Sequence, residues 1–382
     1  MPTRTLRRST LLLAAIALAL APACGTTKSE RRYSKAQAAA SLARFESIGL
    51  EIGEFSIDGG ESVIDGDTIR VKGLKSSMRL SCIDTEETFK KAEERRAYAE
   101  GWATYLKKMR GNSDRPVKIA SPLGEDAKHF AQQFFRGVTR VRLERDTSGE
   151  IRDFYGRYLA YVFVEKDGKW VNYNVECVRA GMSPYFTKYS YSRRFHKEFE
   201  EAQEQARSAQ VGIWDPNKEH YPDYDERILW WNARAEVIAA FEKDAARATN
   251  FYQLPRWDTF KQLEKRVGQE VVLLGSVSEI RLGDSGPTIV KLARTRTSSF
   301  DVVFFDKDVF LSSGMQKAKG EYVRVKGVVR KYRNKHNNTD QLQLIVNAPG
   351  QVMLAGEQLD DLLDNGGRRV EAVPAEKGSI RV

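Results

Sequence analysis

Two stretches of the chain alternate apolar and polar residues with a period of two, and longer helical patterns lie between them. The first stretch, from Leu50 to Ile83, contains the short segments EIGEFSI, ESVI, DTIRVKGL and SMRLSCI, which glycine-bearing turns separate. Apolar residues at every second position predict strands. Two further strands are predicted at TRVRLER and YLAYVFVE. The pattern therefore predicts a β meander that two later strands complete.

Helical spacing is typical of the segments that follow. Residues 89–112 are charged and favour a helix, and GEDAKHFAQQFFRG places apolar residues on one helical face. WVNYNVECVRAGMSP predicts a helix that Gly181 and Pro184 terminate. SRRFHKEFEEAQEQARSAQVG predicts another, N-capped by Ser192, and DERILWWNARAEVIAAFEKDAARA predicts a third, long helix.

Strand-like segments return from about Phe260 in the order β-β-β-α-β-β. The predicted fold class is therefore a β-rich α+β protein. It has a five-stranded barrel of the oligonucleotide-binding (OB) type with helices, then a long helix and a second OB-like barrel. The predicted domains span residues 50–216 for the first barrel, 217–255 for a helical linker and 256–355 for the second barrel. Residues 356–382 are predicted to be a flexible tail.

The N-terminal residues predict export. Three arginines precede an apolar run from Leu11 to Ala21, and APACG follows, so residues 1–23 have the three parts of a signal peptide. Cys24 directly after Ala23 is typical of a bacterial lipoprotein site, which predicts a lipid anchor in the cell envelope or outer membrane. Ordinary cleavage after Ala23, with release to the periplasm or medium, is the alternative. Residues 24–49 are then a polar tether.

Net charge and cysteine number narrow the picture further. The 382 residues carry a formal net charge of +10, which favours an anionic partner such as nucleic acid or a membrane surface. Cys82 and Cys177 could bridge in an oxidising compartment, or could be two buried free thiols. The four histidines are scattered, and they lack the spacing of a zinc site.

The segment ESVIDGDTIRV interrupts a strand with Asp65, Gly66 and Asp67. Two carboxylates one residue apart repel each other, and a solvated turn is one interpretation. RLSCIDTEET then adds Asp84 and Glu87. Oxygen ligands for a hard cation, an extra carboxylate to activate water and arginines to match phosphate oxygens are the groups that metal-assisted phosphodiester cleavage needs.

From about Glu51 to Trp214 the chain resembles the staphylococcal nuclease (thermonuclease) family. VIDGDTIRV, RLSCIDTEET, DFYGRYLAYVFV, VECVRAGMS and ARSAQVGIWD occur in the family's order. The resemblance implies an OB-type barrel with three helices. It also implies a Ca²⁺-dependent endonuclease or exonuclease that hydrolyses DNA or RNA to 3′-phosphate products.

The resemblance also assigns roles to residues. Those implied to hold or surround Ca²⁺ are Asp67 and Asp84 through their carboxylates, Thr85 through its carbonyl, and Asp65 behind them. Those implied to act in catalysis are Glu87 as the general base and Arg79 and Arg157 on the phosphate. Those expected to stack on the substrate are Tyr185 and Tyr189, although a gap-free count places Thr187 at one expected tyrosine.

Two departures from the family pattern and one conflict with strand geometry lead to further expectations. Glu86 replaces the usual proline, which predicts a looser loop around Glu87 and a negative charge near the metal. An insertion of roughly thirty residues, 89–120, predicts a helical flap beside the cleft. Arg79 and Asp84 are five residues apart, so strict strand alternation places them on opposite faces, and a bulge or the end of the strand must realign them.

The second barrel has no predicted catalytic cluster. VRVKGVVRKYRNKH combines basic and aromatic residues, which is typical of single-strand binding. The residues expected to contact nucleic acid there are Arg330, Lys331, Tyr332 and Arg333. A spacer or protein-docking barrel is the alternative. For the whole chain, the alternative to a nuclease is a surface lipoprotein that binds nucleic acid or protein without cutting.

Overall fold

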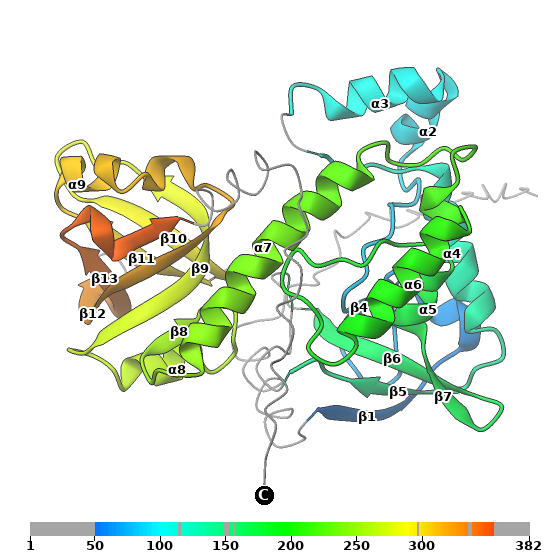
Figure 1. The fold of residues 1–382 in the computed structure, drawn as a ribbon, viewed down its shortest axis with the longest axis horizontal. Coiled ribbons are helices and arrows are strands. Elements are labelled where there is room, and N and C mark those ends of the chain that lie inside the picture. The colour runs from blue at the N-terminus through cyan, green and yellow to red at the C-terminus, as the bar shows by residue number, and fades with distance from the viewer. Residues whose placement is uncertain are drawn as a thin grey trace, which may run out of the picture.

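The structure, a computed structural model, describes residues 50–113, 116–147, 153, 155, 157–295, 298–334 and 338–354. The predicted signal peptide, tether and C-terminal tail lie outside these residues. Two sheet-containing lobes flank the long helix α7 (Tyr224–Ala245), which runs between them (Figure 1). Among the described residues, no helix is both long enough and apolar enough to cross a bilayer.

The first lobe is built on the strands that the alternating pattern predicts. They are β1 (Glu51–Ser56), β2 (Val63–Asp65), β3 (Thr68–Ile69), β4 (Met78–Leu80), β5 (Arg140–Glu144), β6 (Tyr158–Lys166) and β7 (Lys169–Asn172). Their order is β1-β5-β6-β4-β3-β2, with β7 paired to β6, and β4 and β6 run parallel. The Lys72 amide donates to the Ser56 carbonyl over 2.8 Å, which ties the residues after β3 to the end of β1. The predicted five-stranded OB-type barrel is confirmed.

Three helices cover this barrel in Figure 1. They are α4 (Pro122–Phe134), α5 (Tyr173–Arg179) and α6 (His196–Ser208). Ser121 caps α4, since its Oγ accepts from the Gly124 amide at 3.0 Å. In α6 the predicted inward residues Phe199, Ala202 and Ala206 are buried because their spacing puts them on one face.

Two local predictions need correction. Residues 170–172, predicted to begin a helix, belong instead to strand β7 (Lys169–Asn172), which pairs with β6, and α5 begins only at Tyr173. Ser192 does not occupy the cap position of α6, whose first residue is His196. Its Oγ accepts from the Phe195 amide at 2.9 Å, so it caps the preceding turn.

The insertion after the first barrel's loop folds as two short helices, α2 (Ala92–Ala99) and α3 (Trp102–Arg110), which Gly101 separates at φ 108°. They stand above the first lobe in Figure 1. Their aromatic side chains form a cluster with Ile213, Tyr221 and Tyr224. This helical segment is therefore packed against the start of α7.

The second lobe is a closed five-stranded barrel with the predicted order of elements. These are β9 (Glu270–Arg281), β10 (Thr288–Thr295), β11 (Ser298–Phe304), α9 (Lys307–Ser312), β12 (Tyr322–Asn334) and β13 (Thr339–Val346). The path β9-β10-β11-β13-β12 closes because β12 also pairs with β9. Strands β11 and β13 are parallel, like β4 and β6, so both lobes have the OB topology. Additional elements are β8 (Phe251–Gln253), α8 (Thr259–Glu264) and β14 (Val352–Leu354).

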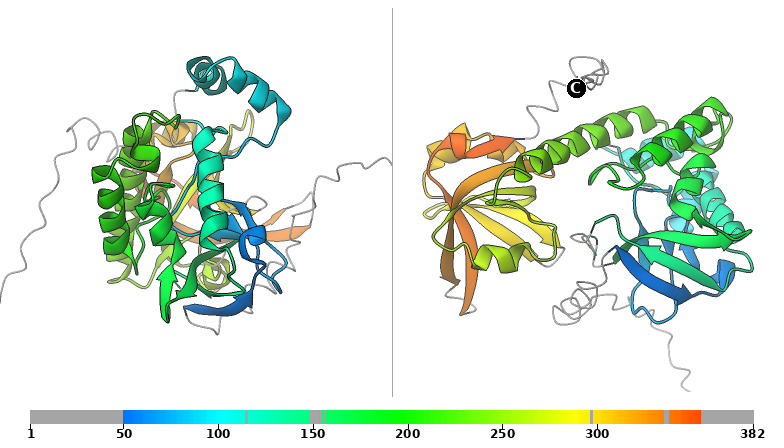
Figure 2. Two further views of the ribbon diagram at one scale, coloured as in Figure 1. Left: turned by 90° about the vertical axis from the view of Figure 1, so that its right-hand side faces the viewer. Right: turned by 60° about the horizontal axis from the view of Figure 1, so that its bottom comes forward.

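Helix α7 contacts both lobes (Figures 1 and 2). On the first lobe, Phe186 packs against Trp231 with ring centroids 4.8 Å apart, and Thr187 donates to Asn232. On the second, Arg234 pairs with Glu321 at 2.6 Å, and both side chains are largely buried. An apolar cluster completes this contact, formed by Val237, Ile238, Phe241, Leu274 and Tyr322.

Two glycines allow a close backbone crossing between the end of α5 and the segment that follows α6. Gly181 and Gly212 have φ values of 68° and 62°, in the left-handed region. A Cβ on Gly181 would overlap the Val211 carbonyl, and one on Gly212 would overlap the Gly181 carbonyl. The Ile213 amide donates to the Gly181 carbonyl at 2.8 Å across this crossing.

We predict that Gly181→Ala destabilises the protein by about 2–5 kcal/mol, because left-handed backbone costs about 1–2 kcal/mol and overpacking about 1–3 kcal/mol. Gly73→Ala is the matched control: its φ is 86°, but a Cβ there meets nothing within 4 Å. The control should show the backbone cost alone. Urea unfolding of both variants measures the difference, and equal losses would contradict the close-crossing argument.

Candidate active site

The turn between β2 and β3 brings two buried aspartates to one end of the first barrel. Asp65 ends β2, and Asp67 directly precedes β3. Gly66 lies between them because a Cβ there would be 2.8 Å from Thr85 Cγ2. Its carbonyl accepts from the Tyr173 hydroxyl at 2.7 Å. The glycine thus lets the loop after β4 pack directly on the turn.

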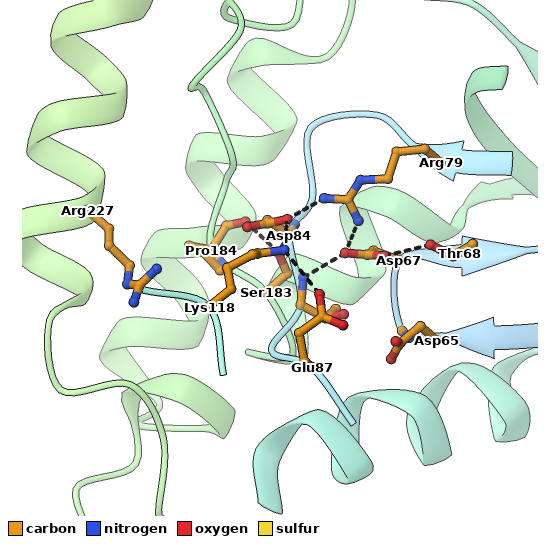
Figure 3. A network of polar contacts seen from close by, with 12 residues as sticks. Asp65, Asp67, Thr68, Arg79, Asp84, Glu87, Lys118, Ser183, Pro184 and Arg227 are labelled. Carbon is orange, nitrogen blue, oxygen red and sulfur yellow. Dashed lines mark hydrogen bonds and ion pairs between the residues drawn. The ribbon is translucent and has the colours of Figure 1, made fainter. Parts of the chain in front are cut away.

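Arg79 joins the two aspartates that the sequence assigns to a metal. Its guanidinium pairs with Asp67 through Nη1 and with Asp84 through Nη2 (Figure 3). The conflict with strand alternation is resolved by the end of the strand. β4 stops at Leu80, and Cys82 has a φ of 62°, which turns the chain and returns Asp84 to the side of Arg79.

Backbone and hydroxyl donors hold the two aspartates in place. Thr68 Oγ1 donates to Asp67 Oδ1 at 2.8 Å, and the Thr85 amide donates to Asp67 Oδ2 at 3.2 Å. The Asp84 amide donates to Ser183 Oγ at 2.8 Å. Burial alone would raise the pKa of Asp84, but the positive charges of Lys118 and Arg79 outweigh it and lower the pKa. Asp84 is therefore ionised at neutral pH.

Two lysines that the sequence did not single out hold Glu87. Lys118 Nζ lies 2.7 Å from Asp84 Oδ1 and 3.5 Å from Glu87 Oε1. Lys90 Nζ lies 2.8 Å from both Glu87 Oε2 and Asp65 Oδ2. Burial would raise the pKa of Glu87, but Lys118 and Lys90 lower it. Glu87 remains 37% exposed, so a water or substrate can approach it.

Lys90 and Lys118 lie in the insertion 89–120, which has no place in the family pattern, so no motif pointed to them. They are nevertheless part of the cluster that the predicted acids form. Counting the directly paired groups, four carboxylates (Asp65, Asp67, Asp84, Glu87) meet three cations (Arg79, Lys90, Lys118), which leaves one net negative charge.

The residues predicted to bind Ca²⁺ fit a hard cation by donor type. Asp67 and Asp84 are close enough to share one guanidinium, and the Thr85 amide contacts Asp67. Thr85 Oγ1 is buried and has no hydrogen-bond partner among the described residues. Within the same residues no three acidic, histidine or cysteine side chains converge as a ready ligand set.

Arg157 pairs with Asp153. Its Nε and Nη2 both lie 2.7 Å from Asp153 Oδ2, and Asp153 also accepts from the Arg157 amide at 2.8 Å. Tyr155 next to this pair is 60% exposed. Arg157 is therefore held in a charged turn, and its predicted role on the phosphate stays a prediction.

The two predicted stacking tyrosines have different environments. Tyr185 is 3% exposed, stacks on Phe199 at an interplanar angle of 7°, and accepts from the Ser192 amide. Its ring is buried in the core, so the prediction that Tyr185 stacks on a base is wrong. Tyr189 is 57% exposed. Tyr189 remains a candidate for base stacking.

Lys188, beside Tyr189, is a further residue that sequence reasoning missed. Its ammonium lies 4.8 Å from the centroid of the Trp230 ring of α7. Burial and then the nearby Arg234 lower the pKa of Lys188 to about 8. The side chain therefore brings an adjustable positive charge to the rim on which Tyr189 lies.

Glu86 does not loosen the loop. Its side chain is buried, with 1% of the residue exposed, and it accepts from the Tyr221 amide at 2.7 Å and from the Tyr224 hydroxyl at 2.8 Å. Burial raises the pKa of this carboxyl, while its hydrogen bonds oppose the shift. The carboxyl of Glu86 is therefore bound by these donors, and it does not face the predicted metal site as expected.

The basic residues of the second barrel are not gathered with the carboxylates. β12 begins against α7, where Arg324 pairs with Asp244 at 2.7 Å. Arg330, Lys331, Tyr332 and Arg333 lie toward its other end, roughly 20–30 Å of strand from Arg324. All four are exposed, and both Lys331 and Arg333 pair with Asp340 at 3.2 Å.

Neither of the two described cysteines forms a disulfide. Cys177 is fully buried, which raises its pKa to about 12. Cys82 is half-buried, with its Sγ 3.4 Å from the Tyr161 hydroxyl. Of the two sequence interpretations, the structure has unbridged thiols.

An OB-type barrel with carboxylates, a bridging arginine and an accessible glutamate at one end defines a class of proteins suited to phosphodiester chemistry. Comparison with known proteins agrees with this class. The family described as "Staphylococcal nuclease homologue" matches residues 77–216.

Curated relatives match the same part of the chain. An uncharacterized protein of Methanocaldococcus jannaschii is 30% identical over 155 residues, which is 40% of this chain and 69% of that protein. Endonuclease YncB of Bacillus subtilis is 30% identical over 40% of this chain and 59% of its own length. The thermonuclease of Staphylococcus hyicus is 30% identical over 40% of this chain and 72% of its own length. The chain thus spans less than two thirds of endonuclease YncB. This chain belongs to the staphylococcal nuclease family.

Proposed function

We propose that this protein is an exported, Ca²⁺-dependent nuclease that hydrolyses phosphodiester bonds in DNA or RNA. One observation carries the proposal: Arg79 joins Asp67 and Asp84 at the place where the accessible carboxylate of Glu87 meets the same cluster. Membership of the staphylococcal nuclease family and the relatives named endonuclease and thermonuclease support it.

Each residue has a distinct part in the proposed reaction. Glu87 accepts a proton from the water that attacks phosphorus. Arg79 donates to the phosphate oxygens as negative charge gathers on them, and Arg157 does so near the leaving oxygen. The bond from phosphorus to the 5′-oxygen then breaks and that oxygen takes up a proton from water, which gives a 3′-phosphate and a 5′-hydroxyl. Asp67, Asp84 and the Thr85 carbonyl would hold Ca²⁺, with Asp65 behind them, and the ion would supply positive charge to the phosphate.

The lowered pKa of Glu87 bears on its role as a base. A carboxylate paired with two ammonium groups is ionised at neutral pH, as a base must be, but it attracts a proton weakly. An incoming phosphate offers Lys90 and Lys118 another anion to pair with. We propose that substrate binding draws these lysines from Glu87 and so raises its basicity at the moment of reaction.

We predict that Glu87→Gln lowers kcat by roughly 10²–10⁴, the range for a positioned general base, and retains Ca²⁺ binding. For the wild type, Ca²⁺ at 100 times its Kd should stabilise the fold by about 2.7 kcal/mol, and excess chelator should abolish cleavage. Cleavage of a labelled oligonucleotide and thermal unfolding with and without Ca²⁺ measure both effects.

Glu93→Gln is the matched control, because Glu93 lies on α2 and its side chain is 74% exposed. It should leave both readouts unchanged. Full turnover in Glu87→Gln would reject the base assignment. Wild-type protein that binds Ca²⁺ and nucleic acid but never cuts would favour the non-catalytic lipoprotein instead.

For the second barrel we propose binding of single-stranded nucleic acid by the exposed end of β12. Each lysine or arginine on a phosphate releases counterions, with a log–log salt slope of roughly 0.7 per contact for single strands. Replacing Arg330, Lys331 and Arg333 by alanine should weaken binding of a long single strand and flatten its salt dependence. Tyr332→Ala should cost about 1–3 kcal/mol if its ring stacks on a base.

Fluorescence anisotropy at several salt concentrations makes this test. Lys261→Ala on α8, another exposed lysine of the same lobe, is the control. A triple variant with the affinity and slope of this control would leave the barrel as a spacer or docking module.

Export and a lipid on Cys24 are proposals that rest on residues 1–24 alone. Expressed in a bacterium with its leader, the wild type should partition into detergent, and Cys24→Ser should remain in the aqueous phase. Equal partitioning of the two would mean that the protein is not lipidated at Cys24.

A further inference from the structure

A buried carboxylate with no part in the proposed chemistry lies between Thr85 and Glu87. We infer that Glu86 is a positioning residue, which ties the loop that carries Thr85 and Glu87 to the start of the interdomain helix α7. The inference rests on the proposed nuclease function, since it is Glu87 that Glu86 would position.

The donors to Glu86 come from two distant parts of the chain. Ser121, the cap of α4, donates to Oε2 through its hydroxyl. The Tyr221 amide and the Tyr224 hydroxyl donate to Oε1 at 2.7 and 2.8 Å. A buried carboxylate needs such donors to offset its lost hydration, so the loop and the helix start are held in one arrangement.

The same contacts fix the backbone of Glu87. The Ser121 amide donates to the Glu87 carbonyl at 3.0 Å, and the Phe89 amide donates to Glu125 at 2.9 Å. Gly124 lies so close that a Cβ on it would overlap the Glu87 carbonyl. Ser121 therefore hydrogen-bonds both to the side chain of Glu86 and to the backbone of Glu87.

The start of α7 reaches the site by a second route, through the residues on either side of Lys118. Arg227 donates to the Val117 carbonyl at 2.6 Å. The Tyr221 hydroxyl accepts from the Ile119 amide at 2.9 Å and donates to the Ile119 carbonyl at 2.5 Å. Val117 directly precedes Lys118, whose ammonium reaches Asp84 and Glu87 (Figure 3). The start of α7 thus supports both the loop that carries Glu87 and the segment that carries Lys118.

The far half of α7 is fixed to the second barrel by the Arg234–Glu321 pair and the apolar cluster around Phe241. Both halves belong to one helix of 22 residues. Helix α7 therefore both supports the loop that carries Glu87 and attaches the second barrel.

Four full-length variants test the inference. Glu86→Ala should lower kcat by about 10–100-fold with KM within about twofold, because the base is displaced while phosphate contacts remain. Glu86→Gln should restore most of that loss, since its oxygen can accept from Tyr221 and Tyr224 and its amide can donate to Ser121 Oγ. Tyr224→Phe keeps the ring, removes one donor to Glu86 and should lower kcat about 3–30-fold.

Tyr98→Phe is the matched control, since Tyr98 packs against the same aromatic cluster but its hydroxyl contacts Glu219. It should retain the wild-type kcat. Hydrogen exchange gives a readout that needs no activity: in Tyr224→Phe the amides of residues 84–89 should exchange faster, and in Tyr98→Phe they should not.

The outcomes separate the two hypotheses. Equal kcat and equal exchange in Tyr224→Phe and Tyr98→Phe would overturn the positioning role, even where Glu86→Ala fails to fold. A wild type without nuclease activity would reject the proposed function, and the exchange measurement would still decide whether Glu86 holds the loop. Loss of activity in Glu86→Gln equal to that in Glu86→Ala would also count against positioning by hydrogen bonds.

Discussion

Mutual repulsion of carboxylates is the constraint on which the arrangement of the first lobe depends. Asp65, Asp67 and Asp84 are each under a tenth exposed, so water cannot screen them well. The fold supplies Arg79 from β4, Lys90 from the segment before α2 and Lys118 from the segment before α4. Local details follow from this need: the glycine at the β2–β3 turn and the left-handed Cys82 both bring acids within reach of these cations.

The two barrels show how little of such a site the topology itself requires. In the first, acids occupy the turn between β2 and β3 and the loop after β4. In the second, Asp306 follows β11 in the corresponding place, but its carboxylate caps α9 by accepting from the amides of Asp308 and Val309. The same connectivity therefore uses one acid to begin a helix and another to build a charged cluster.

The features that the sequence predicted correctly are those that depend on residues close together along the chain. Alternation located the strands, helical spacing located α4, α6 and α7, and the order of motifs located the acids, because loops at one end of a barrel meet. Lys90 and Lys118 could not be found, since the path of their insertion depends on packing against Tyr221 and Tyr224, more than a hundred residues later. Tyr185 and Tyr189 are alike in sequence, and only the packing of Phe199 shows which one is buried. Glu86 was misread for the same reason, because its partners are 135 and 138 residues away.

The long sequence separation between Glu86 and its partners also affects the order in which parts of the protein fold during synthesis. A chain made from its N-terminus exposes the first barrel's strands and the acids long before residues 221–227 exist. Until then Glu86 lacks the partners that α7 provides, and the segment around Lys118 lacks Arg227. The loop that carries Thr85 and Glu87 therefore acquires its final geometry late in synthesis, when helix α7 docks. A nascent or C-terminally broken chain would carry every acid of the site and still lack its support.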